Sequence, residues 1–298
     1  MSLPPTIEAG QCKLCAYRDV EWLYPEFGMI RCKECGLVWT PEIPDPECIK
    51  QVYSETYFRS SNSGALGYDD YAADRLKISR TFHKRMAEIE KLTGKRGRLL
   101  DVGCALGFSL EVAKLRGWEA VGIEISDYAC DYARQKLGVD AICGSLANID
   151  PVNENFDVIT MWDYIEHNPD PPGELTMANR LLKKGGLLAM TTPNIRSLPA
   201  RIWGPRWMGI KKGEHLFYFS PETLRRLLET GGFEIIRMKH VGKYINVGFF
   251  IKRVGLYSAT MERVLSGAAH TLNISDRVLY INPYDILLVY GRKTRAVT

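Results

Sequence analysis

The stretch that decides the fold is Leu99-Leu100-Asp101-Val102-Gly103-Cys104-Ala105-Leu106-Gly107-Phe108. The apolar residues 98–102 predict a buried strand, and residues 109–116 predict the helix that follows. A glycine-rich turn between them lets a ligand approach the backbone and the amino end of that helix. The next predicted strand, residues 119–124, ends in Glu124, where an acidic side chain can bind ribose hydroxyls. Together these residues would line the crevice where open α/β sheets bind ligands.

Strand and helix patterns continue to alternate along the rest of the chain. We expect further strands at 141–144, 156–163, 186–192, 233–241 and 286–290, and helices at 68–92, 128–137, 174–182 and 221–230. Ser220 followed by Pro221 is typical of a helix start. This alternation predicts an α/β fold with a mostly parallel sheet and helices on both faces.

Four of the eight cysteines form two pairs near the N-terminus, Cys12/Cys15 and Cys32/Cys35, with sixteen residues between the pairs. This spacing is typical of a structural zinc site, because two tight turns can close a tetrahedral shell of four thiolates. Gly36 fits the left-handed position of such a turn. Residues 20–24 and 29–31 predict the short strands of a zinc ribbon. The alternatives are unrelated buried thiols or redox-active pairs.

Composition places the chain among ordinary globular proteins. It has 298 residues, of which 46% are hydrophobic and 25% charged, and its net charge is only +4. That charge does not favour a nucleic-acid partner. No apolar run reaches the roughly 18–20 residues of a membrane span, and we see no secretory signal, so we expect a cytoplasmic protein. We expect a zinc ribbon over 1–48, a helical linker or cap over 49–96, and a core over 97–298 with a helical insertion near 243–280.

In combination, the motifs resemble those of the class I S-adenosylmethionine-dependent methyltransferases. Asp101-x-Gly103-x-Ala105-x-Gly107 is similar to their Asp-x-Gly-x-Gly-x-Gly motif, and Leu181–Gly186 is similar to the Leu-Lys-x-Gly-Gly turn before their fifth strand. Alanine at 105 is tolerable if that position does not require positive φ. The resemblance implies a Rossmann-like sheet of seven strands, the last one antiparallel. It implies cofactor binding by Asp101, Gly103, Cys104, Ala105, Gly107, Glu124, Ile125, Ser145, Leu146 and Trp162, although Trp162 could equally be a packing residue.

Four polar residues follow the fourth and fifth strands of this pattern: Asp163, Glu166, His167 and His215. In one interpretation, His167 or His215 is a general base. In another, the four side chains bind a divalent cation, which resembles the Glu-x-x-Glu-His plus distant His set of ubiquinone-type and small-RNA O-methyltransferases, with the shorter Asp163 in place of a glutamate. In a third, Glu166 and His167 only hydrogen-bond their own loop. We expect the long loop over 194–219, which carries His215, to roof the acceptor site.

A four-cysteine ribbon ahead of this core resembles bacterial methyltransferases that modify sugars, polysaccharides and natural products. The resemblance implies O- or C-methylation of a small-molecule or glycan-linked acceptor. RNA methylation is one alternative, although the basic and acidic residues of the ribbon balance each other. A protein that binds S-adenosylmethionine but has lost its activity is the other. The insertion near 243–280 would either cover the acceptor pocket or form the face of a homodimer.

Overall fold

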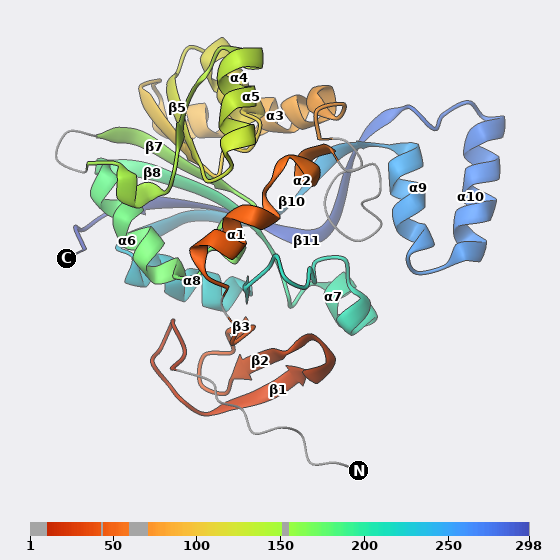
Figure 1. Cartoon of the computed structure of the whole chain (residues 1–298), viewed down its shortest axis with the longest axis horizontal. Coiled ribbons are helices and arrows are strands. Elements are labelled where there is room, and N and C mark those ends of the chain that lie inside the picture. Colours follow the sequence, from red (N-terminus) through yellow and green to blue (C-terminus); the bar gives the residue numbers. More distant parts are fainter. Residues whose placement is uncertain (1–10, 43, 60–70, 151–154, 298) are drawn as a thin grey trace.

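A seven-stranded sheet runs through the centre of the protein, seen in Figure 1. Its strands are β4 (Arg98–Val102), β5 (Glu119–Glu124), β6 (Asp140–Cys143), β7 (Phe156–Trp162), β8 (Leu182–Pro193), β10 (Phe233–Asn246) and β11 (Val278–Lys293). They lie in the order β10-β11-β8-β7-β4-β5-β6, and only β11 is antiparallel to its neighbours. The structure is a computed structural model that describes residues 11–42, 44–59, 71–150 and 155–297. The predicted Rossmann-like α/β class and the antiparallel last strand are confirmed.

Helices cover both faces of this sheet, as Figure 1 shows. On one face lie α3 (Arg75–Thr93), α4 (Phe108–Leu115) and α5 (Asp127–Leu137), and on the other lie α6 (Pro171–Leu181) and α8 (Pro221–Thr230). Each face has its own apolar core. The first core includes Phe82, Met86, Ile89, Phe108 and Val112, and the second includes Leu175, Leu181, Leu224, Leu227 and Leu228. Burial of these side chains supplies most of the free energy that holds the layers together.

Of the helix starts that we predicted, that of α8 is confirmed, whereas α6 and α3 begin at other residues. Helix α8 begins as expected, because the Ser220 hydroxyl accepts a hydrogen bond from the Thr223 N–H at 3.3 Å and Pro221 occupies the first turn. Helix α6 begins at Pro171, earlier than the predicted residue 174, since proline is favoured in a first turn. Helix α3 begins at Arg75, later than predicted, while residues 68–70 lie outside the described residues.

The N-terminal sheet contains three strands from the N-terminal segment and one strand from the core. Its strands β1 (Val20–Tyr24), β2 (Met29–Cys32) and β3 (Val38–Trp39) are antiparallel, and β3 pairs with β9 (Phe217–Tyr218) from the core. The expected loop over residues 194–219 is therefore partly regular, because it also contains α7 (Leu198–Trp203). We call residues 11–40, with their three strands, the ribbon.

Two short helices connect the ribbon to α3. They are α1 (Pro46–Val52) and α2 (Glu55–Arg59). Helix α2 lies within residues 49–96, where we expected a helical linker or cap, whereas α1 begins three residues before that stretch. Asp45 begins α1, because its carboxylate accepts a hydrogen bond from the Cys48 N–H at 2.8 Å.

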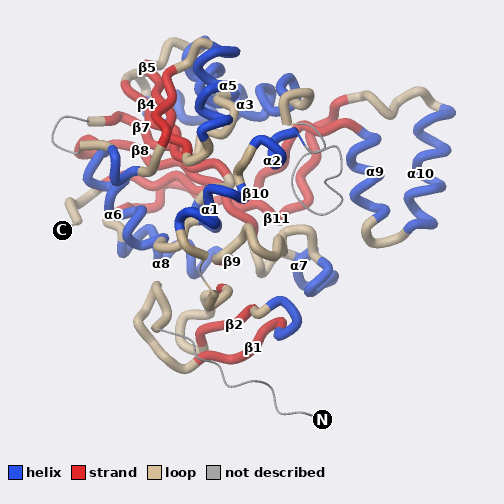
Figure 2. The backbone as a smooth tube through the Cα atoms, in the orientation of Figure 1, coloured by secondary structure: helices blue, strands red, loops and turns tan. Residues whose placement is uncertain are grey.

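A helical hairpin projects from the C-terminal half of the chain. It consists of α9 (Val247–Gly255) and α10 (Ala259–Thr271), and it lies within the segment in which we expected an insertion. Figure 2 shows β10 and β11 running toward it, and the two strands remain paired as far as Asn246 and Val278, beyond the predicted strand ends. Within the described residues, no helix is long and apolar enough to cross a membrane.

Candidate active site and cysteine cluster

A cavity of about 960 Å³ lies at the carboxyl ends of the central parallel strands. Open α/β sheets bind their ligands at this edge, because the loops after neighbouring strands meet there. Most of the predicted site residues line the cavity: Asp101, Gly103, Cys104, Ala105, Glu124, Ile125, Ser145, Trp162, Asp163, Glu166, His167 and His215. The fold thus brings the expected cofactor-binding residues and the expected catalytic residues to one space.

Two predicted cofactor-binding residues, Gly107 and Leu146, do not line this cavity. Gly107 has a φ of 87°, and a Cβ atom there would lie 2.9 Å from the Ala133 Cβ and 3.1 Å from the Val139 Cγ2. This glycine therefore allows α4 to pack closely on its neighbours. Leu146 is 1% exposed and belongs to the apolar core. Both residues support the shape of the cavity from behind its wall.

Asp101 ties the glycine-rich turn to the elements on either side of it. Its carboxylate accepts hydrogen bonds from the Ser109 hydroxyl and from the Thr160 hydroxyl, the latter at 2.5 Å. The side chain is buried, and this burial raises its pKa to about 6. Asp101 thus links β4 to α4 and β7, and holds the turn in place.

Glu124 and Ala105 form the second fixed part of this turn. One carboxylate oxygen of Glu124 accepts a hydrogen bond from the Ala105 N–H at 2.9 Å, and the other accepts one from the Ser126 N–H at 3.0 Å. Burial raises the pKa of Glu124. Each oxygen retains acceptor capacity on the cavity side, which fits the two adjacent hydroxyls of a ribose.

We expected alanine to be tolerated at position 105 if that position does not require a positive φ, and this condition is not met. Its φ is 49°, so the position does adopt the left-handed conformation that favours glycine. Such a conformation costs an alanine about 1–2 kcal/mol. The hydrogen bond from its N–H to Glu124 helps to hold it there.

On the opposite side of the cavity, Glu166, His167 and His215 form a compact group. One ligand atom from each lies within 4.8 Å of the others, and the two imidazole rings are 4.6 Å apart between centroids. We call these three residues the Glu-His-His group. They come from the turn after β7 and from the segment that precedes β9.

Both histidines in the group have a defined proton position. The Nδ1 of His167 lies 2.9 Å from the carbonyl oxygen of Glu214, and the Nδ1 of His215 lies 2.9 Å from that of Gly209. A carbonyl oxygen only accepts, so each Nδ1 carries the proton, which at His167 also faces the Tyr53 hydroxyl oxygen 2.8 Å away, and each Nε2 is left with its electron pair. Burial and the positive charge of Lys211 lower the pKa of His167 to about 4, and burial lowers that of His215 as well. Both rings are therefore neutral near pH 7.

Glu166 is the most unusual member of the group. It is 1% exposed, and among the described residues neither carboxylate oxygen has a hydrogen-bond partner. The Thr192 hydroxyl lies near enough to favour the ionised form, but it too has no partner within hydrogen-bond geometry. Burial and the negative charge of Asp163 raise its pKa to about 8. A buried carboxyl group without partners is costly, and the usual compensation is a proton or a cation. Two imidazoles and one carboxylate would bind a divalent cation and leave positions open on the cavity side.

Asp163, the fourth expected member, is outside this group. Its carboxylate contacts the Lys243 ammonium at 2.5 Å and accepts a hydrogen bond from the Thr191 hydroxyl at 2.9 Å. Burial opposes ionisation of Asp163, but Lys243 and Arg85 outweigh it and lower the pKa of this carboxyl group. The residue also has a φ of 50°, a conformation often found at functional sites.

Among the cavity residues that were not predicted from the sequence, two contact predicted site residues directly. The Tyr53 hydroxyl, at the end of α1, lies 2.8 Å from the Nδ1 of His167. Tyrosines are dense in this part of the chain, which was a usable signal, but nothing connected them to a histidine so far away. Lys243 reaches Asp163 only because β10 extends past its predicted end.

The outer part of the cavity is apolar and aromatic. The apolar side chains that line it from α7, α9 and the adjoining turns are Pro199, Trp203, Trp207, Met208, Phe249, Phe250, Val254 and Tyr257, and the charged side chains in this part are Lys211 and Arg253. The rings of Trp203 and Tyr257 stack with centroids 4.0 Å apart, and the Trp207 indole N–H donates a hydrogen bond to Asp285 at 3.2 Å. Helix α9 therefore covers the cavity, as in one of the two roles expected for the insertion.

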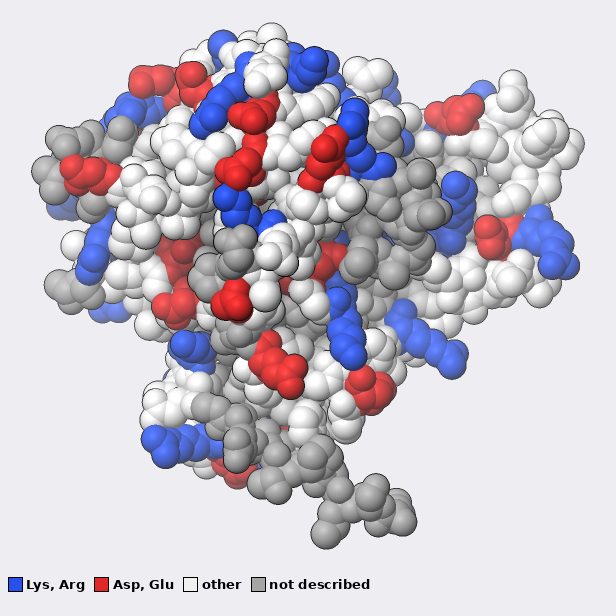
Figure 3. Space-filling model, viewed as in Figure 1, with Lys and Arg blue, Asp and Glu red and all other residues white. Residues whose placement is uncertain are grey.

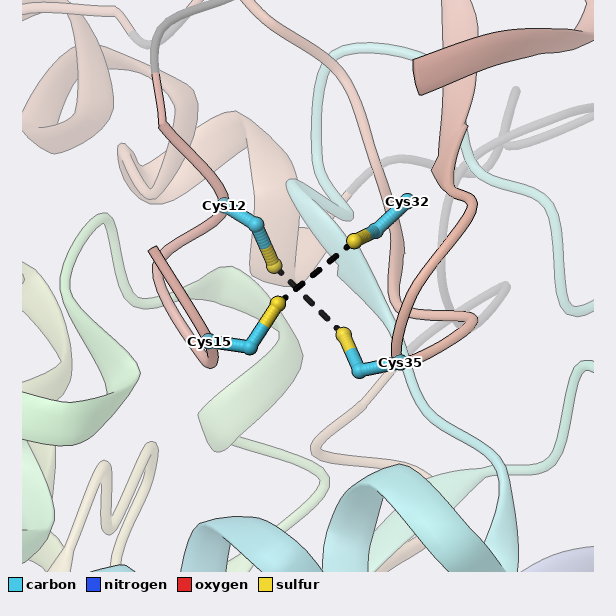
Figure 4. Close-up of side chains that lie close together, drawn as sticks. All are labelled: Cys12, Cys15, Cys32 and Cys35. Atoms are coloured by element: carbon cyan, nitrogen blue, oxygen red, sulfur yellow. Dashed lines mark hydrogen bonds between the residues drawn. The ribbon is translucent and has the colours of Figure 1, made fainter. Parts of the chain in front are cut away.

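The four N-terminal cysteines converge on one point, as Figure 4 shows. The Sγ atoms of Cys12 and Cys35 are 3.5 Å apart, as are those of Cys15 and Cys32. A regular tetrahedron with Zn–S distances of about 2.3 Å has edges of about 3.8 Å, so the group is close to the size of a zinc site. Hydrogen bonding with Cys12 and burial raise the pKa of Cys35, so without a cation the thiolate form is disfavoured.

The two turns that carry these cysteines have the same backbone conformation. The residue after each pair has a positive φ, 60° for Ala16 and 76° for Gly36. Their N–H groups donate hydrogen bonds to the carbonyl oxygens of Cys12 and Cys32 at 2.8 and 3.0 Å. The left-handed position expected of Gly36 is confirmed.

Charges on the ribbon are paired internally. Arg31 contacts Glu21, and the Lys33 ammonium lies 3.0 Å from the Asp19 carboxylate. On the face drawn in Figure 3, basic and acidic side chains are intermixed, and its described residues present no continuous basic stripe. A phosphate backbone requires a concentration of positive charge, so this surface does not favour a nucleic-acid partner.

Comparison with known proteins gives a consistent result. A family model described as a methyltransferase domain matches residues 71–238. The ubiquinone biosynthesis O-methyltransferase of Methylococcus capsulatus is 31% identical over 172 residues, which cover 53% of this chain and 72% of that protein. The protein of the same name from Coxiella burnetii is 28% identical over 159 residues, covering 49% and 68%.

Solved structures share the fold at lower identity. The magnesium protoporphyrin IX methyltransferase of Synechocystis has a TM-score of 0.53 and 12% identity, and the match covers 84% of this chain and all of that one. A SAM-dependent methyltransferase from Archaeoglobus fulgidus has a TM-score of 0.51 and 19% identity, with 75% and 99% covered. At these identities the likeness is one of fold.

Proposed function

The chain belongs to the methyltransferase domain family and is an S-adenosylmethionine-dependent methyltransferase, and on this premise we propose that it methylates a hydroxyl group of a small, largely apolar molecule. The observation that carries the proposal is the shared cavity, which is lined both by residues of the cofactor motif and by the Glu-His-His group. The names of the O-methyltransferase relatives support a hydroxyl acceptor.

When bound, S-adenosylmethionine supplies an electrophilic methyl group. The residues that would hold it fit that task. The Glu124 carboxylate would accept hydrogen bonds from the ribose hydroxyls, and the backbone of Gly103 and Ala105 permits close approach. Ser145 lies on the cavity wall where we expect the adenine end.

We further propose that the Glu-His-His group holds a divalent cation. Three features support this: the short distances between ligand atoms, the free Nε2 of both histidines, and the Glu166 carboxylate without partners. Such a cation acts as a Lewis acid and lowers the pKa of a nearby hydroxyl. The Nδ1 contacts with Glu214 and Gly209 would fix both rings as ligands. Asp163 would stay with Lys243 beside the group.

The alternative is that His167 or His215 acts alone as the general base. Both are neutral near pH 7 and could accept a proton, but their low pKa values make them weak bases. A neutral imidazole with a low pKa is a better ligand than proton acceptor, which favours the cation.

The apolar outer cavity bears on the acceptor. Its tryptophan, phenylalanine and tyrosine side chains fit an aromatic or aliphatic body better than a sugar, whose hydroxyls would lose their hydrogen bonds with water there. We therefore favour an apolar hydroxyl compound as the acceptor over the glycan-linked acceptor that we expected. The homodimer stays a prediction.

We also propose that the four cysteines bind structural Zn²⁺. All four positions of a tetrahedral shell would be filled by protein, which leaves none for substrate. Metal analysis of the purified protein, expected to give about one zinc per chain, tests this.

Calorimetry and a transfer assay test the function. We expect S-adenosylmethionine to bind to the protein and the Glu124→Ala variant to lose most of that affinity. Labelled methyl donor should then be transferred to hydroxylated aromatic compounds in preference to sugar nucleotides or short RNA. Transfer to RNA alone would support the RNA alternative. Binding of the donor without transfer to any acceptor would support a protein that has lost its activity.

A further inference from the structure

The ribbon and the Glu-His-His group are connected through the backbone. Strand β3 pairs with β9, so that Val38 lies opposite Tyr218 and Trp39 opposite Phe217. At its other end, β3 begins directly after the second cysteine turn, where the Cys32 N–H donates a hydrogen bond to the Leu37 carbonyl at 2.9 Å. The hydrogen bonds thus run from the cysteine cluster to the strand that follows His215.

Leu216 continues this connection into the group. Its carbonyl accepts a hydrogen bond from the Thr40 N–H at 3.0 Å, and its own N–H donates one to the Glu166 carbonyl at 2.8 Å. Leu216 is the residue after His215, and Glu166 is a member of the group itself. The ribbon is therefore one peptide unit away from two members of the group.

Side-chain packing follows the same path. Trp39 of the ribbon belongs to the same buried cluster as Ile165, Leu216 and Phe217, which flank the group. Ile165 is 0%, Leu216 3% and Phe217 1% exposed. The contact between ribbon and core is therefore dry, and a displacement of β3 would be felt by its neighbours.

Strand β9 has only two residues, which is too short to be stable by itself. The segment from α7 to β9 is mostly irregular, and it must hold a buried histidine beside a buried carboxyl group. A strand from outside this segment, paired with β9 in a defined register, would hold the segment in one conformation. β3 is that strand, and the cysteine turns define its starting point.

We propose that the ribbon is a positioning element for the Glu-His-His group, so that zinc in the cysteine site sets the placement of Glu166 and His215. This inference rests on the proposed function for its effect on turnover, but not for its structural content. Among the described residues, none of these backbone hydrogen bonds joins the ribbon to β4 or β5, which carry the cofactor motif, so donor binding should be independent of the ribbon.

A matched pair of variants at Thr40 tests the connection without touching a cysteine or a member of the group. Thr40→Pro removes the N–H that donates to Leu216, whereas Thr40→Val keeps it and loses only the hydroxyl contact at 3.5 Å. The readouts are zinc content, affinity for S-adenosylmethionine, turnover, and the ring ¹⁵N signals of the five histidines.

For Thr40→Pro we expect the ring signals of His167 and His215 to shift or broaden, while those of His83, His240 and His270 stay unchanged. Turnover should fall on the order of ten- to a hundredfold, as for other small misplacements of reacting groups. Zinc content should be unchanged because all four cysteines are retained, and donor affinity should stay within about twofold because Glu124 and the glycine-rich turn are unaltered. Thr40→Val should behave like the natural protein in every readout.

A second variant, Cys35→Ser, removes zinc and leaves the core sequence intact. We expect the same two histidine signals to change while the donor still binds. Unchanged His167 and His215 signals in Cys35→Ser would overturn the role of zinc, and unchanged signals in Thr40→Pro would overturn the connection through the backbone; either result overturns the proposal. If the natural protein transfers no methyl group, the proposed function fails, yet the histidine signals still decide whether the ribbon positions the group.

Discussion

The cysteine cluster and the Glu-His-His group are two candidate ligand sets of opposite kinds. The cysteines are separated by at most 23 positions, lie on two similar turns and close a shell of four soft ligands. The Glu-His-His group joins two distant segments, has three ligands and faces the cavity. A closed thiolate shell stabilises a fold, whereas an open shell of nitrogen and oxygen ligands can act on a substrate. This difference is the reason why we propose a structural role for the cysteines and a chemical role for the Glu-His-His group.

Removal of one cysteine should have the largest effect. We expect Cys32→Ser to lose stoichiometric zinc, because structural zinc binding contributes about 10–16 kcal/mol in comparable small domains. Limited proteolysis should then cut within residues 11–40 while the core still binds the donor. The exposed Cys48 offers a control, since Cys48→Ser should keep its zinc. Full zinc content in Cys32→Ser would contradict a four-cysteine site.

A change in the open group should affect turnover and leave stability and donor binding nearly intact. We expect His215→Gln to reduce turnover by about 10²–10⁴-fold. Affinity for S-adenosylmethionine should stay within about twofold, because Glu124 and the glycine-rich turn are unchanged. His270→Gln, at an exposed position on α10, is the matched control. Equal turnover in the two variants would exclude His215 from the reaction.

The pH dependence of cation binding is a further difference between the Glu-His-His group and the cysteine cluster. The pKa of Glu166 is raised to about 8, so a cation must displace a proton below that pH. Cation affinity should therefore rise with pH, by up to about tenfold per unit, and level off above pH 8. Titrations with Mg²⁺ or Mn²⁺ between pH 6 and 9 measure this dependence.

The protonation of Glu166 should also make the free energy of unfolding depend on pH. Without a cation, the folded protein holds a proton on Glu166 between its unfolded pKa of about 4.5 and 8, so the free energy of unfolding should fall as pH rises through that window. Glu166→Gln should abolish this pH dependence of the free energy of unfolding. It should also abolish the rise of cation affinity with pH. A pH-independent affinity in the natural protein would mean that Glu166 is not a ligand.

The smallest expected effect concerns the two cysteine turns. Gly36→Ala should lower the free energy of unfolding by about 1 kcal/mol, because alanine is strained at a φ of 76°. Ala16→Gly should have the opposite sign and a smaller size, since the relief of strain is offset by about 0.4–1 kcal/mol of chain entropy. Urea titrations at saturating zinc measure both. Effects of the same sign would show that the turns are not equivalent.

Local patterns predicted much of this molecule. The cysteine spacing indicated a four-ligand site because the ligands lie close in sequence, and the alternation of strands and helices indicated a mostly parallel sheet covered by helices. Asp101 and Glu124 were found because each lies at or next to the carboxyl end of a strand. Gly107 and Leu146 were assigned to the cavity by position in a motif, which does not reveal whether a residue faces the ligand or the core.

Tertiary structure decided the rest. The pairing of Asp163 with Lys243, the contact of Tyr53 with His167 and the pairing of β3 with β9 join residues that are distant in the chain. No local periodicity encodes such contacts, because they depend on how far strands extend and how layers pack. The amino-acid sequence by itself determined the fold, the cofactor motif and the cysteine site. Only the tertiary structure decided which residues share the acceptor end of the cavity and joined the ribbon to it.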